Sequence, residues 1–145
     1  REDYFDLVFT SPPYFKVERY QGDDSSWNRY GEFDEWMNEF LFKLLTNGYE
    51  SLVDGGLMII NISDCKLKEL HKICMPAIEF CQKELHGCKC LGVMGYELAP
   101  RVGANIEVKD TNAEPMLVFR KDLSGNYSQN IEQLFFKERH ENSNY

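Results

Sequence analysis

An apolar run that passes directly into a proline pair is the feature that most restricts how this chain can fold. Asp6 to Tyr14 read Asp-Leu-Val-Phe-Thr-Ser-Pro-Pro-Tyr, the pattern of a buried strand followed at once by a rigid turn. Prolines lack an N–H group, so the carbonyls at this turn are left to accept hydrogen bonds. Open α/β sheets bind ligands at the carboxyl ends of their strands. Carbonyl acceptors beside the Tyr14 ring suit a planar group with an exocyclic amine, such as a nucleobase.

The proline pair also has a plainer interpretation, because such pairs occur in ordinary turns and in the ligands of interaction modules. An exposed recognition peptide does not normally follow an apolar strand, so the setting favours a ligand site. Segment 15–31 continues from the pair without helical or strand periodicity. We expect a long loop there that acts as a lid or binding loop, with a solvated connector as the alternative.

Size and composition predict one globular domain. The chain has 145 residues, of which 43% are apolar and 14% aromatic, enough to build a core. No run approaches the ~18 apolar residues of a membrane span, and the first residues are charged. We therefore expect an intracellular protein, in the cytoplasm, nucleoid or nucleus, with no membrane partner. The formal net charge of −8 argues against gripping nucleic acid mainly through phosphates, unless a basic surface is local or lies outside this chain.

The apolar pattern predicts alternating strands and helices. Helical spacing begins at Phe33, and Gly55-Gly56 is expected to end that element before the next strand. A strand, helix and strand in succession favour a parallel pair. A second helical pattern contains Pro76, which should lie in its first turn. No helical pattern separates the last two strands, so we expect them to pair antiparallel. The predicted strands are residues 4–10, 57–62, 88–96 and 114–120.

Two sets of residues are given no functional role. The aromatic residues Phe33, Trp36 and Phe40 recur at helical spacing, which is more typical of a core than of a cofactor site. The cysteines are odd in number and none of their spacings matches a zinc pair, so we expect reduced thiols and no metal site. The cysteines are Cys65, Cys74, Cys81, Cys88 and Cys90.

Three segments, in order, resemble the DNA amino-methyltransferases, which methylate an exocyclic nitrogen of cytosine or adenine. Thr10 to Tyr14 is similar to the serine form of their Asp/Asn/Ser-Pro-Pro-Tyr/Phe signature. Residues 52–56, Leu-Val-Asp-Gly-Gly, resemble the entry to the next strand, and residues 114–121, Glu-Pro-Met-Leu-Val-Phe-Arg-Lys, resemble the closing strand. The resemblance covers about residues 3–121.

The resemblance implies an α/β fold, namely part of a class I S-adenosylmethionine-dependent, Rossmann-like methyltransferase sheet. This chain would supply strands four to seven, of which the last two are antiparallel. Residues 1–121 would form the catalytic half of the domain, and residues 122–145 a polar carboxyl-terminal tail. The glycine-rich turn that holds the methionine part of the cofactor in this family is absent from the sequence. We therefore expect the cofactor-binding half upstream of Arg1, and a chain that is inactive alone.

The same resemblance assigns roles around the proline pair. The amino group of a flipped base would donate hydrogen bonds to the Ser11 side chain and the Pro12 carbonyl, while the base stacks on Tyr14. Pro13 would hold the turn, and Thr10 and Ser11 would contact S-adenosylmethionine. Serine in the first position favours cytosine N4 as the target, with adenine N6 next. No metal ion is implied.

Further substrate contacts are expected from Phe15, Lys16, Arg19 and Arg101, with DNA as the partner of the full enzyme in a restriction-modification setting. Two alternatives stay open: an RNA or protein-amide methyltransferase, and a non-catalytic, methyltransferase-like interaction fragment. An incomplete sheet would also leave residues 4–10 as an exposed apolar edge. We therefore expect a homo-oligomer joined through that edge or through the helix faces that the missing half leaves uncovered.

Overall fold

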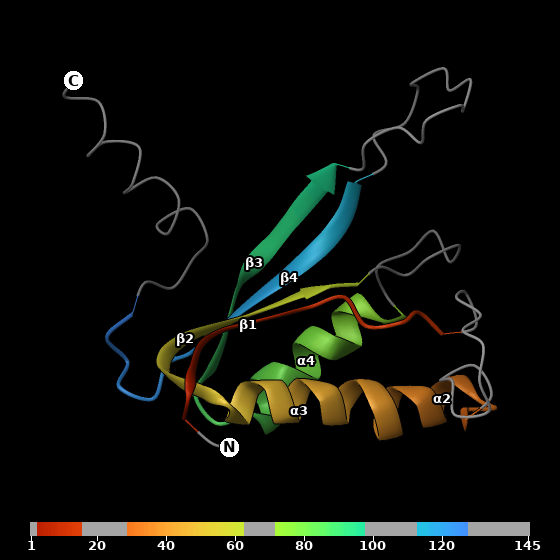
Figure 1. The fold of residues 1–145 in the computed structure, drawn as a ribbon, viewed down its shortest axis with the longest axis horizontal. Coiled ribbons are helices and arrows are strands. Elements are labelled where there is room, and N and C mark those ends of the chain that lie inside the picture. The colour runs from red at the N-terminus through yellow and green to blue at the C-terminus, as the bar shows by residue number, and fades with distance from the viewer. Residues whose placement is uncertain (1–2, 16–28, 63–71, 98–112, 128–145) are drawn as a thin grey trace.

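A computed structural model describes residues 3–15, 29–62, 72–97 and 113–127 and shows a mixed α/β fold (Figure 1). Four strands form one sheet in the order β1-β2-β4-β3. Strand β1 runs parallel to β2, whereas β4 is antiparallel to both β2 and β3. The parallel pair and the antiparallel last pair were both predicted from the pattern, and both are confirmed. The strands are β1 Phe5–Thr10, β2 Leu52–Asn61, β3 Cys88–Glu97 and β4 Ala113–Lys121.

The described helices lie together on one face of the sheet (Figure 1). One continuous helical run consists of α2 Phe33–Trp36, the π-helical turn η1 Met37–Leu41 and α3 Phe42–Glu50. The other helix, α4 Cys74–Glu84, contains Pro76 in its first turn, as predicted. None of the helices in the described ranges is long and apolar enough to cross a membrane.

The prediction that Gly55-Gly56 ends the first helix is wrong. That helix ends at Glu50, and both glycines lie inside β2. Gly55 has a φ of 89°, and a Cβ there would lie 2.6 Å from the Cζ atom of Tyr127. The positive φ favours glycine at this position, because residues with a Cβ rarely adopt it. The pair therefore allows a strand distortion and a contact with a segment that is distant in the sequence.

The helix-covered face of the sheet holds the core. Residues of β2 alternate in burial, and Met58 and Ile60 are at most 1% exposed because they face the helices. The aromatic stripe is part of this core, as predicted, since Trp36 is fully buried and Phe33 and Phe40 pack against the cluster. Other fully buried members are Leu41, Leu45, Leu52, Ile62, Leu117 and Phe119.

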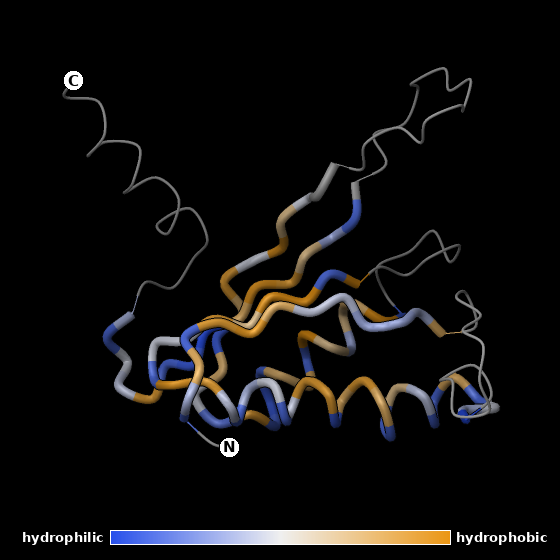
Figure 2. Tube along the Cα trace, in the orientation of Figure 1, coloured by the Kyte–Doolittle hydropathy of each residue, from blue (hydrophilic) through white to orange (hydrophobic). Residues whose placement is uncertain are grey.

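The opposite face carries no helix among the described residues. Leu7 and Phe9 of β1 pair with Leu57 and Ile59 of β2, so these side chains share that face. Leu7 is 52% exposed and Phe9 58% exposed. Figure 2 shows the apolar colouring of β1 giving way to paler colours toward its carboxyl end. Since β1 is also an edge of the described sheet, the prediction of an exposed apolar edge is confirmed.

A buried lysine fastens the start of β1 to the rest of the sheet. Lys121 Nζ donates hydrogen bonds to Asp3 Oδ1 at 2.7 Å and to the carbonyl of Leu52 at 2.8 Å. It also lies 5.5 Å from the ring centre of Tyr49 on α3. Burial raises the pKa of Tyr49, whose hydroxyl donates to the carbonyl of His86 at 2.7 Å. One side chain of β4 therefore connects β2, α3 and the residue Asp3, which lies just before β1.

Candidate active site

The proline corner follows β1 at the carboxyl end of the parallel pair. Thr10, the last residue of β1, pairs with Ile60 of β2, and the chain then leaves the sheet. Ser11 is exposed, whereas Pro12 is buried. A hydroxyl therefore faces solvent on a turn anchored by a buried ring. This arrangement fits the expected ligand position at a strand end.

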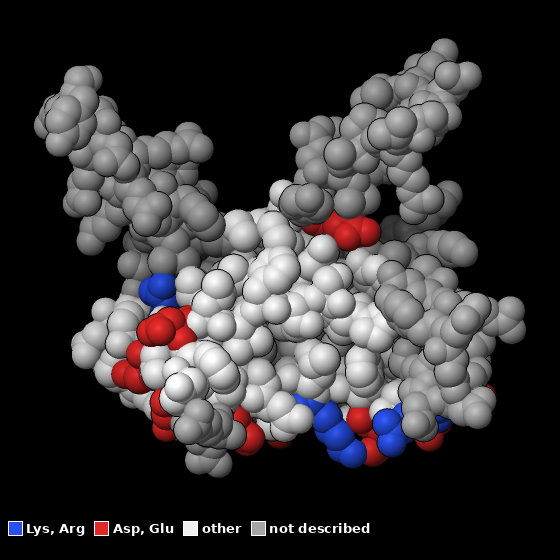
Figure 3. Space-filling view, viewed as in Figure 1, with Lys and Arg blue, Asp and Glu red and all other residues white. Residues whose placement is uncertain are grey.

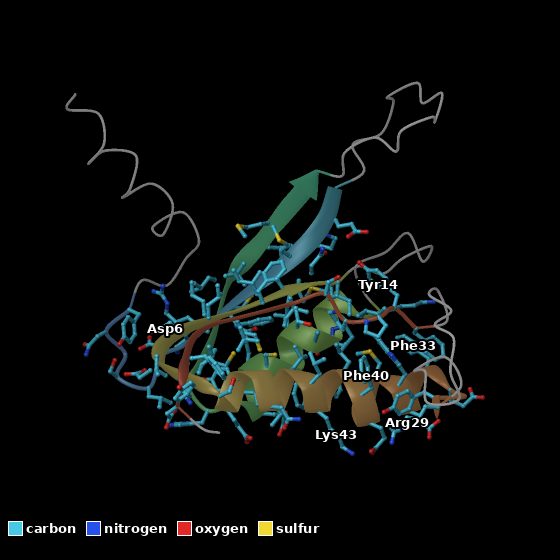
Figure 4. The ribbon with its side chains drawn as sticks, viewed as in Figure 1. Asp6, Tyr14, Arg29, Phe33, Phe40 and Lys43 are labelled. Atoms are coloured by element: carbon cyan, nitrogen blue, oxygen red, sulfur yellow. The ribbon has the colours of Figure 1, made fainter. Side chains whose placement is uncertain are left out.

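The Tyr14 ring is buried, whereas a ring that stacks on a base must be accessible. It is 8% exposed and belongs to the core cluster. Figure 4 shows Tyr14 at the same end of the molecule as Phe33 and Phe40. Full stacking of a base on this ring would therefore require the ring to move out of its packed position.

An aromatic cluster lies beside the corner. Phe15 contacts Phe33 edge to face, with ring centres 5.4 Å apart, and lies 5.9 Å from the ring centre of Trp36. Trp36 in turn lies 5.8 Å from Phe40. Phe15, which we predicted to contact substrate, is half-buried in this cluster. Its rings hold the residues after the proline pair against the first turns of the helix.

An apolar groove runs between β1 and the helix, with a volume of about 660 Å³. Six of its lining residues are Val8, Thr10, Phe40, Leu44, Met58 and Ile60. Figure 3 shows the surface around β1 as largely uncharged, with charged side chains gathered along the helix below it. Lys43 and Glu39 form an ion pair at the rim of the groove. Of the predicted site residues that the structure describes, only Thr10 lines this groove.

The remaining predicted contacts cannot be placed, because Lys16, Arg19 and Arg101 lie outside the described residues. Among the cysteines, Cys65 also lies outside them. A hydrogen bond with Cys88, together with burial, raises the pKa of Cys81. Burial likewise raises the pKa of Cys90, so both groups are neutral thiols at neutral pH. Within the described ranges, no group of three His, Cys, Asp or Glu residues could hold a metal ion.

One polar residue at this edge was missed by the sequence prediction. Asn61 ends β2, beside the end of β1, and its Oδ1 atom is buried without a hydrogen-bond partner in the described structure. The signal was a single amide at the end of the apolar run 57–60. Asparagine is depleted in strands, so its position there calls for an explanation.

Comparison with known proteins identifies the family. A putative DNA modification methylase of Thermus thermophilus has a similar structure, with 24% identity and a TM-score of 0.54 over 95% of this chain and 54% of that chain. Its selenomethionine derivative gives 23% identity and a TM-score of 0.52 over the same shares. A methyltransferase from Pyrococcus furiosus is 23% identical, with a TM-score of 0.42 over 84% of this chain and 43% of that chain.

The chain thus spans about half the length of the structures it matches. No curated protein matches it. A model of the family described as DNA methylase matches residues 5–144, nearly the whole chain. On that match, the chain belongs to the DNA methylase family.

Proposed function

We propose that this chain is the catalytic half of an S-adenosylmethionine-dependent enzyme that methylates an exocyclic amino group of a DNA base. The observation that carries the proposal is the position of residues 11–14, Ser-Pro-Pro-Tyr, directly after β1 at the carboxyl end of a parallel pair. Ligands of open α/β sheets bind at this position. Membership of the DNA methylase family makes a DNA base the fitting substrate.

The corner supplies acceptors rather than a base or a nucleophile. The amino group of an extruded base would donate one hydrogen bond to the Ser11 hydroxyl and one to the Pro12 carbonyl. These bonds orient the nitrogen lone pair and stabilise the positive charge that develops on nitrogen during transfer. Pro13 restricts the backbone so that the two acceptors stay fixed. No covalent enzyme intermediate is needed.

The described residues can supply only some of the contacts that would hold the methyl donor, S-adenosylmethionine. Thr10 is half-buried at the groove and Ser11 is exposed, so their hydroxyls can reach a ligand beyond the strand end. When bound, S-adenosylmethionine supplies an electrophilic methyl group from its sulfonium. Its remaining contacts are assigned to a complementary half of the domain, which we place upstream of Arg1.

The proposed upstream half could pack against the β1 edge of this chain. The apolar β1 edge is exposed, and the groove beside it is uncovered on the described chain. An added strand would pair with the backbone of β1 and bury Leu7 and Phe9. A second copy of this chain could use the same edge, which gives the homo-oligomer as the competing occupant.

We place cytosine N4 first as the target because serine opens the motif, with adenine N6 next. The assay is transfer of labelled methyl groups to matched oligonucleotides containing cytosine, adenine or neither as acceptor. The protein assayed is this chain extended by the proposed upstream half, called the longer polypeptide below. Methylation of the cytosine substrate is expected, whereas methylation of RNA or of a glutamine peptide alone would favour the RNA or protein-amide alternative.

A non-catalytic fragment is the second candidate, favoured by the net charge of −8 and by the burial of Tyr14. Calorimetric titration of S-adenosylmethionine separates the two functions. We expect no binding by the 145-residue chain and binding by the longer polypeptide. Absence of binding by both would support the interaction fragment.

A further inference from the structure

Asn61 has a buried acceptor that the fold does not use. Residues 57–60 of β2, Leu-Met-Ile-Ile, are all apolar, and the strand then ends in this amide. Its Oδ1 atom is inaccessible to solvent and accepts no hydrogen bond in the described structure. An unsatisfied buried acceptor destabilises a protein, so such atoms usually have a functional or ligand-related explanation.

The position of Asn61 brings it to the proline corner. Thr10 and Ile60 are the last paired residues of the parallel strands, and Ser11 and Asn61 each come one residue later. Adjacent strands lie about 4.8 Å apart, so these two residues belong to the same short stretch of the sheet edge. Burial alternates through Ile60, Asn61 and Ile62, which places Asn61 on the face opposite the helices.

Strand order indicates which ligand the amide would meet. The free edge of β1, where the complementary half would pack, lies on one side of the corner, and β2 lies on the other side. Asn61 is therefore on the side away from the half assigned to the cofactor. A group bound between the ends of β1 and β2 would be the base rather than the methyl donor.

We propose that Asn61 is a substrate-binding residue whose Oδ1 shares with the Ser11 hydroxyl one of the two N–H hydrogens of the extruded base's amino group, while the Pro12 carbonyl accepts the other. This inference rests on the proposed function and adds a specificity element to it. An acceptor at this place favours a base that carries an amino group, such as cytosine, and disfavours the keto group of uracil. A purely structural asparagine would instead contribute to folding.

The first measurement compares urea unfolding of the unaltered chain and Asn61→Leu. Leucine has a similar size, and it removes an acceptor that has no partner, so the midpoint is expected to stay unchanged or rise. Ile59→Val, two residues earlier on β2, is the control for general perturbation of the strand end. A clear drop in the midpoint for Asn61→Leu alone would show a structural role and overturn the proposal.

The second measurement uses two single-stranded oligonucleotides that differ only in one deoxycytidine or deoxyuridine, with binding followed by fluorescence anisotropy. The unaltered chain should prefer deoxycytidine by about tenfold or more, because several acceptors face the amino group. Asn61→Leu should weaken that preference by about threefold, since the Ser11 and Pro12 acceptors remain, whereas Ile59→Val should keep it in full.

The outcomes separate this inference from the proposed function. If the unaltered chain prefers deoxycytidine and Asn61→Leu keeps the preference in full, the role of Asn61 is wrong and base recognition stands. If the unaltered chain binds both strands equally or neither, recognition of an amino-bearing base by this chain fails, and the role of Asn61 fails with it.

Discussion

The two faces of the sheet differ in how much of their apolar surface is buried. On the helix-covered face, Met58 and Ile60 are at most 1% exposed, beneath α3 and α4. On the other face, Leu7 and Phe9 are more than half exposed although they belong to an equally apolar strand. Among the described residues, the helix-covered side of the sheet therefore holds a packed core, which we call the finished face, and the other side carries exposed apolar side chains, which we call the unfinished face. The unfinished face is the one to which our proposals assign a partner.

Removing a side chain from the core between the finished face and its helices should have the largest effect on stability. Leu41→Ala should lower the free energy of unfolding by about 2–5 kcal/mol, because Leu41 is fully buried and a cavity would remain. Leu7→Ala should change it by under about 0.5 kcal/mol, since that side chain is half exposed. Urea unfolding measures both. Equal losses would mean that the two faces do not differ in this way.

Tyr14 links the packed core to the site, so its replacement should affect both stability and turnover. Tyr14→Ala in the longer polypeptide should reduce turnover by orders of magnitude and, because the ring is buried, cost about 3 kcal/mol of stability. Tyr14→Phe keeps the ring and serves as the matched control for packing. Near-normal methyl transfer by a folded Tyr14→Ala protein would remove Tyr14 from the site.

The lysine that fastens β1 provides a smaller test on the covered face. Lys121→Met should cost about 1–3 kcal/mol, because the Leu52 carbonyl loses its buried donor. Asp3→Asn should cost under about 1 kcal/mol, since the Asp3 side chain is 66% exposed. Thermal unfolding of the two variants measures the contrast. A larger loss for Asp3→Asn would reverse this assignment.

Charges on the unfinished face should change association with little effect on stability. Leu7→Lys and Phe9→Lys together should reduce concentration-dependent association, because both side chains lie on the apolar β1 edge. Met75→Lys on α4, also an exposed apolar position, is the control. Light scattering over a range of concentrations provides the readout. A monodisperse monomer for the unaltered chain would contradict self-association through this edge.

Local pattern was sufficient to predict four strands, although β2 begins at Leu52 and not at residue 57. The exposed edge was predicted from the incomplete sheet that the resemblance implies. Apolar runs and the lack of a helix between the last two strands predicted the sheet pairing that is observed. Gly55 was misread because the reason for it lies in Tyr127, far along the chain. The position of residues 11–14 was predicted, but the burial of Tyr14 was not, because it depends on packing of the aromatic cluster. Asn61 was missed because an orphan acceptor is visible only in three dimensions.

The central claim is that the Ser-Pro-Pro-Tyr corner presents two acceptors to the amino group of a DNA base. The most direct measurement is single-turnover methyl transfer by the longer polypeptide, unaltered and as Ser11→Ala. Because Ser11 is exposed, the substitution should leave the unfolding midpoint unchanged. It should slow transfer by about tenfold or more, the value of one hydrogen bond to a developing charge. An equal rate of transfer by both proteins would contradict the claim.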